Sequence, residues 1–152
     1  MLRLYQKYRA LDSNRKKACW RAFCWLGVLG AALKLSSFKN LVAHLERRPG
    51  DALASPLDEA ARTLAAVTGW AVATAACHLP WRSSCLVQAL AAQRMLMRQG
   101  IPGVLYLGAA IDAGNGRGKA IDAHAWLKCG GEFITGGFPH QAYTAITAYG
   151  WQ

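Results

Sequence analysis

The hydrophobic pattern of the chain changes at Gly100 and Pro102, and this change most constrains the fold. Before it, apolar residues recur at spacings of three and four, as in amphipathic helices. After it come short apolar runs typical of strands. Helices followed by antiparallel strands predict an α+β fold in a chain of 152 residues, which suits one domain. We expect residues 1–75 to form a helical region that packs on a core of residues 76–152, in one compact unit.

The spacing predicts helices over residues 2–11, 14–35, 38–48, 56–77 and 85–97. The third follows a capping serine, Ser36 or Ser37, and the fourth has Pro56 in its first turn. The fifth lies in SSCLVQALAAQRMLMRQGIPG, residues 83–103, where Ser84 or Ser83 is the cap. Its expected inner stripe is Leu86, Ala89, Leu90, Leu96 and Met97.

Strands are expected over VLYLGAAI (residues 104–111), AHAWLKC (123–129) and EFITGG (132–137). The last two are joined at Gly130–Gly131, which is a signal for a hairpin turn. A regular hairpin around this turn pairs Ala125 with Gly136 and Trp126 with Thr135. The loop between the first two of these strands contains GNGRG. It has no Walker pattern and no helix follows it, so we expect no phosphate site there.

The charge of the chain is uneven: residues 1–21 hold seven basic residues and one acid, out of a formal net charge of +10. Two interpretations stay open, a solvated basic helix and a docking surface for an acidic partner. No nucleic-acid-binding motif accompanies the charge, so we expect no nucleic acid partner. The most apolar run, residues 22–33, has 12 residues, fewer than a membrane-spanning helix needs, and no signal-peptide cleavage site follows it. We expect a buried helix, with peripheral membrane contact left open by Trp20 and Trp25 beside basic residues.

The five cysteines are odd in number, irregularly spaced and without a CxxC pair. This pattern favours reduced thiols and a cytoplasmic location over a disulfide framework. Cys77, His78, Cys85 and Cys129 have no usual ligand spacing, so we expect neither metal nor cofactor.

Cys85 is expected in the first turn of its helix, where unpaired N–H groups and the helix dipole favour a thiolate. His124 follows 39 residues later on a predicted strand, and a Cys–His pair would supply a nucleophile and a general acid. The alternatives are a structural buried cysteine and a core histidine. Gln93 lies on the apolar stripe, where bracing the site is favoured over substrate contact, and Trp126 is expected as core or pocket wall.

Two stretches of the chain resemble the lasso-peptide B protein family, the leader peptidases related to the microcin J25-processing protein. These are transglutaminase-like, papain-like proteins with a cysteine-bearing helix and an antiparallel sheet. The residues that carry the resemblance are Cys85, Leu86, Ala89, Leu90, Gln93, Gly100, Ile101, Pro102, Gly108, His124, Ala125 and Trp126.

The family pattern implies a Cys–His–Asp triad, and its acid falls near Gly136, where this chain has no carboxylate. Thr135 or a backbone carbonyl is the expected substitute for orienting His124. Glu132 and Asp122 are the nearest acids in sequence. We therefore expect a catalytic Cys85–His124 dyad supported by Ser84, Gln93 and Trp126.

The resemblance implies a stand-alone cysteine peptidase that removes the leader from a ribosomally made lasso precursor. It also implies a separate leader-recognition protein and an ATP-dependent lasso cyclase as partners. Two other functions stay open: a non-catalytic scaffold that binds a peptide or partner, and an acyltransferase with the same dyad. The acyl-enzyme is common to hydrolysis and transfer, so the residues alone do not separate them.

Overall fold

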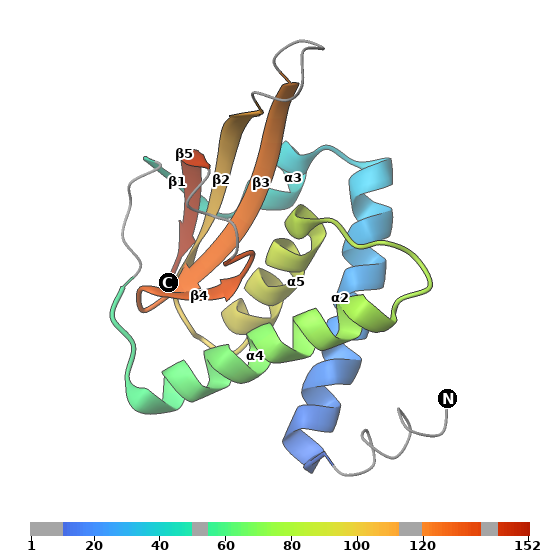
Figure 1. Ribbon diagram of the computed structural model, residues 1–152. Helices are drawn as coiled ribbons and strands as arrows, with labels where there is room; N and C mark the ends of the chain where they lie inside the picture. Colours follow the sequence, from blue (N-terminus) through green and yellow to red (C-terminus); the bar gives the residue numbers. More distant parts are fainter. Residues whose placement is uncertain (1–10, 50–54, 113–119, 138–142) are drawn as a thin grey trace.

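The computed structural model describes residues 11–49, 55–112, 120–137 and 143–152 (Figure 1). Its helices are α2 (Ser13–Leu35), α3 (Phe38–Val42), α4 (Glu59–His78) and α5 (Cys85–Met97). Its strands are β1 (Glu46–Pro49), β2 (Gly103–Asp112), β3 (Ala120–Cys129), β4 (Glu132–Thr135) and β5 (Thr144–Trp151). The predicted α+β fold is confirmed. The helix expected over residues 2–11 and the glycine-rich loop over 113–119 lie outside the described residues.

The five strands form one antiparallel sheet in the order β1-β5-β2-β3-β4. The helices α2, α4 and α5 pack together, and α5 also packs against β2, β3 and β4 (Figure 1). The main core joins these helices to one face of the sheet, which presents Leu105, Ala125 and Leu127. A smaller cluster on the other face contains Tyr106 and Trp126. Strand alternation therefore divides β3 between two environments.

The caps explain where two helices begin. Ser84 caps α5, as predicted, by accepting the Val87 N–H at 3.3 Å. Asp58 caps α4 by accepting the Ala61 N–H at 2.7 Å, so Pro56 lies before the helix and the predicted first-turn position is wrong. The carboxylate of Asp58 can satisfy a free N–H, whereas proline has no side-chain acceptor.

Three features of the sheet were not expected from the sequence: the strands β1 and β5, and the register of the hairpin. The helix predicted to continue to residue 48 ends at Val42, because residues 46–49 pair as β1 with the edge of β5. The hairpin turn at Gly130–Gly131 is confirmed, with φ values of 57° and 87°. The expected register is wrong by one residue: a bulge in β4 sets Thr135 opposite Leu127 instead of Trp126.

The helix α2 is 23 residues long, and its length and composition are sufficient to cross a membrane. One side of it is buried in the protein through Ala22, Leu26 and Leu29, against α4 and α5. A core helix passes the same test of length and composition, so this property alone assigns no location.

Candidate active site

Cys85 is the first residue of α5, and its side chain is half-buried. The Ser84 hydroxyl accepts a hydrogen bond from the Val87 N–H. The Ser84 carbonyl accepts one from the Gln88 N–H at 3.1 Å, which begins the helix. The thiol therefore lies at the positive end of a 13-residue helix, near backbone N–H groups. These N–H groups could stabilise an oxyanion that develops beside Cys85.

The other cysteines are in different settings, and all five are free thiols. Burial raises the pKa of the Cys129 thiol to about 12, and burial also raises the pKa of Cys19. Cys24 and Cys77 are exposed, Cys24 within α2 and Cys77 at the C-terminal end of α4, so neither lies at the start of a helix. Within the described residues, no group of three His, Cys, Asp or Glu side chains is placed to hold a metal ion.

His124 lies on β3, opposite Gly108 of β2, and is half-buried. Its Nε2 atom is 2.9 Å from the carbonyl oxygen of Gly136. A carbonyl oxygen only accepts, so Nε2 carries the hydrogen and donates it. In the neutral imidazole, Nδ1 is then left as an acceptor. A backbone carbonyl thus stands at the position where the family pattern calls for an acid.

Two aromatic rings and one carboxylate lie near the His124 ring. The Trp126 ring is stacked at 5.9 Å between centroids, and the Tyr143 ring lies at 4.8 Å. The Tyr143 hydroxyl donates to the Asp122 carboxylate at 2.5 Å. Asp122 is therefore linked to the histidine through Tyr143, with no hydrogen bond between the two side chains. Sequence reasoning missed Tyr143, because no local pattern marks its contacts with His124 and Asp122.

Cys85 and His124 lie on different sides of the sheet. Cys85 packs against the core that α5 shares with Ala125 and Leu127, whereas His124 alternates with these residues and lies with Trp126. No hydrogen bond joins the two side chains in the part of the chain described. At His124 the edge of β3 away from β2 has no described strand, because β4 pairs only with residues 127–129. Gly136 lies along this edge, close to the Ala125 carbonyl oxygen.

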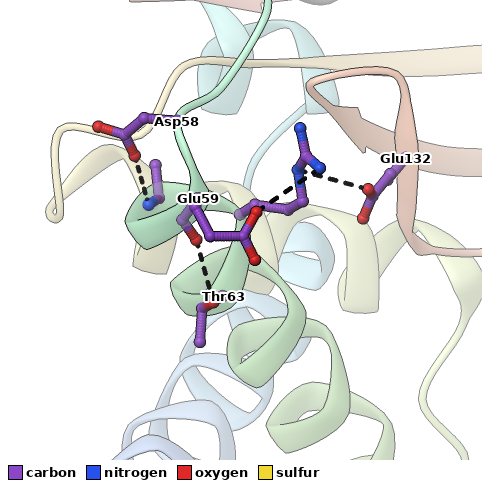
Figure 2. A network of polar contacts seen from close by, with 6 residues as sticks. Asp58, Glu59, Thr63 and Glu132 are labelled. Carbon is purple, nitrogen blue, oxygen red and sulfur yellow. Dashed lines mark hydrogen bonds and ion pairs between the residues drawn. The ribbon is translucent and has the colours of Figure 1, made fainter.

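Of the three possible orienting side chains, Thr135 is buried, and its hydroxyl has no hydrogen-bond partner among the described residues. Glu132 lies at the hairpin, where its carboxylate is 3.6 Å from Arg62 of α4 (Figure 2). Arg62 also lies 3.7 Å from Glu59, so one arginine of α4 pairs with both carboxylates and links the hairpin to the helix. Neither Thr135 nor Glu132 makes a hydrogen bond to His124 in this structure.

Gln93 and Trp126, which were predicted to support the site, lie in different parts of the structure. Gln93 is fully buried in the middle of α5, and its amide nitrogen is 3.3 Å from the Met97 sulfur. Its amide oxygen has no partner among the described residues, so Gln93 is a polar group inside the core under the site. Trp126 stacks on Tyr106 at 5.6 Å as well as on His124, and forms the wall beside the histidine.

Comparison with protein-family models matches residues 25–148 to the family described as Transglutaminase-like superfamily. The matched range begins within α2 and ends in β5, so it contains both Cys85 and His124. Neither the search of curated proteins nor the search of solved structures gave a match.

Proposed function

The chain belongs to the transglutaminase-like superfamily, and on that premise we propose that it is a cysteine peptidase that removes the leader from a lasso-peptide precursor. The superfamily includes cysteine peptidases and acyltransferases, so a reactive thiol is the expected centre. The finer role rests on the resemblance of residues 85–108 and 124–126 to the lasso B proteins.

The hydrogen bond from His124 Nε2 to the Gly136 carbonyl carries the proposal. It fixes the tautomer in which Nδ1 can take the proton of a thiol. The proposed reaction requires a conformation in which His124 Nδ1 reaches the Cys85 thiol and takes its proton. The Cys85 thiolate attacks the scissile carbonyl, and the N–H groups at the start of α5 stabilise the oxyanion. The imidazolium returns its proton to the leaving amine, and water then hydrolyses the thioester.

The proposed partners are a lasso precursor, a separate leader-recognition protein and an ATP-dependent lasso cyclase, in the cytoplasm. The described N-terminal part of the chain is mainly helical, in α2 and α3, which suits a peptidase that receives its substrate from another protein. A recognition protein would raise the effective concentration of the scissile bond at Cys85. We therefore expect slow cleavage by the peptidase alone and faster cleavage with that protein.

The test is cleavage of the full-length precursor by the wild-type chain, Cys85→Ala and the matched control Cys77→Ala, each with and without the recognition protein. Cys77 is exposed at the end of α4, so its loss should leave cleavage unchanged. Cys85→Ala should remove cleavage while circular dichroism remains that of the wild type. Cleavage by Cys85→Ala at the wild-type rate would disprove the peptidase role.

A second candidate is a non-catalytic scaffold that binds a peptide. It is favoured by two observations: Cys85 makes no hydrogen bond to His124 among the described residues, and a carbonyl takes the place of an acid. A scaffold predicts precursor binding without any acyl-enzyme. Mass spectrometry of the chain with an activated peptide ester would detect a thioester at Cys85, and adding an amine would separate acyl transfer from hydrolysis by the product formed.

A further inference from the structure

The helix α2 presents an apolar outward face, which we define as Trp20, Phe23, Cys24, Val28, Ala31 and Leu35. All six residues are exposed. Trp20 is 66% exposed, Val28 58% and Leu35 88%. Trp20 and Phe23 stack on each other at 6.1 Å between ring centroids, so their rings form one apolar surface.

The opposite side of α2 is already occupied. Ala22, Leu26 and Leu29 are buried in the main core against α4 and α5. The helix is therefore apolar on both sides, whereas a helix at a protein surface normally turns a polar face to water. An exposed apolar face of this kind marks an interaction site.

The charge around the outward face has a single sign. No acid occurs from Ser13 to Leu45, while six lysines and arginines do. Lys17 and Arg21 lie at one end of the outward face and Lys34 at the other, all exposed. None of these three pairs with a carboxylate in the described part of the chain.

A pocket of about 170 Å³ adjoins this face, lined by Arg21, Trp25, Met95, Arg98 and Gln99. The Arg98 guanidinium lies 4.9 Å from the centroid of the Trp25 ring, which holds it at the pocket. Arg98 also has no ion pair among the described residues. Two guanidinium groups beside one pocket favour an anionic group such as a phosphate.

We propose that the outward face of α2 binds the surface of an anionic lipid bilayer. The helix lies along the bilayer, because α4 and α5 hold its other side. Trp20 and Phe23 enter the boundary between headgroups and acyl chains, where aromatic rings are favoured. Lys17, Arg21 and Lys34 face the lipid phosphates, and the pocket between Arg21 and Arg98 accepts one phosphate.

The charges favour a bilayer over a protein partner. The core of a protein interface is depleted in lysine and usually meets charges of both signs, whereas this face has lysines at both ends and no acid. An anionic bilayer attracts each basic residue near its surface regardless of exact position. The outward face and the basic residues at its two ends would therefore both bind the bilayer.

The experiment is flotation of the full chain with vesicles of phosphatidylcholine alone or with about one third phosphatidylglycerol, in low and high salt. We expect binding to the anionic vesicles only, with a partition constant that falls in high salt. Trp20→Ala with Phe23→Ala should weaken partition about tenfold, because two apolar side chains no longer insert. The control Ile146→Ala removes an exposed apolar side chain from β5 and should not change partition.

A second pair of variants tests the charges and the pocket. Arg21→Gln with Arg98→Gln should lower partition about tenfold in low salt and make it less dependent on salt. Inorganic phosphate should not compete at millimolar concentration if the bilayer is the ligand, whereas competition would assign the pocket to free phosphate. Equal binding to both vesicle types would overturn the proposal. A dimer that forms through Trp20 and Phe23 without vesicle binding would also overturn it.

Discussion

Gly136 is the position at which the sequence lacks the expected acid, and replacing it tests the carbonyl interpretation directly. Gly136 has φ +64°, and a Cβ atom added there would lie 2.5 Å from the Ala125 carbonyl oxygen and 3.0 Å from the Trp126 Cβ. Gly136→Asp therefore should not restore a triad. We expect it to disturb the segment that presents the carbonyl to His124.

The expected loss of unfolding free energy for Gly136→Ala has two parts. A side chain at positive φ costs about 1 kcal/mol, and forcing a Cβ against packed backbone costs about 1–3 kcal/mol more. Gly136→Ala should thus lower the free energy of unfolding by about 2–4 kcal/mol, or Tm by about 10 °C in a chain of this size. Gly100 is a matched control, because its φ is +67° and nothing lies within 4 Å of its added Cβ. Gly100→Ala should cost about 1 kcal/mol.

The assay is urea denaturation of Gly136→Ala, Gly136→Asp and Gly100→Ala, followed by precursor cleavage at a temperature where all three are folded. Cleavage should fall about tenfold or more in both Gly136 variants, because the His124 acceptor is displaced, and should remain in Gly100→Ala. Gly136→Asp with wild-type stability and faster cleavage would refute the reasoning. It would show that the segment accepts a carboxylate and that the carbonyl is not the intended partner.

Three further predictions follow from the packing and the helix start. Gly69→Ala should lower unfolding free energy by about 2–3 kcal/mol, because its Cβ would meet the Ile134 carbonyl oxygen, and a loss below about 0.5 kcal/mol would contradict the close approach of α4 to β4. At pH 8, iodoacetamide should label Cys24 far faster than Cys129, whose pKa of about 12 leaves about one thiolate in ten thousand, and peptide mapping by mass spectrometry measures both. Ser84→Ala should destabilise the chain by about 1 kcal/mol in urea, and no change would mean that the cap is dispensable.

The parts of the fold that the sequence predicted depend on local chemistry. Ser84 was identifiable as a cap, and the two glycines at 130 and 131 as a hairpin turn, because both signals lie within a few residues. β1 was not identifiable, since ERRP has no apolar alternation and pairs with β5 about 100 residues away. Such long-range pairing decides the conformation of a short segment over its local preference.

The candidate site was likewise predictable only where the signal is local. The position of Cys85 at a helix start and of His124 on a strand followed from the pattern, as did a backbone carbonyl as one substitute for the acid. The bulge in β4 was not predictable, because nothing in EFIT marks an extra residue, and it moved Thr135 by one pairing position. Tyr143 was missed because its contact with His124 depends on how the chain returns to the sheet.

A carbonyl and a carboxylate would hold the histidine with different consequences. Both fix the tautomer in which Nδ1 accepts a proton, but the carbonyl of Gly136 has only a partial negative charge and stabilises an imidazolium less. More of the activation of Cys85 would depend on the dipole and N–H groups of α5. In this chain the first turn of α5 would thus compensate for the acid missing at Gly136.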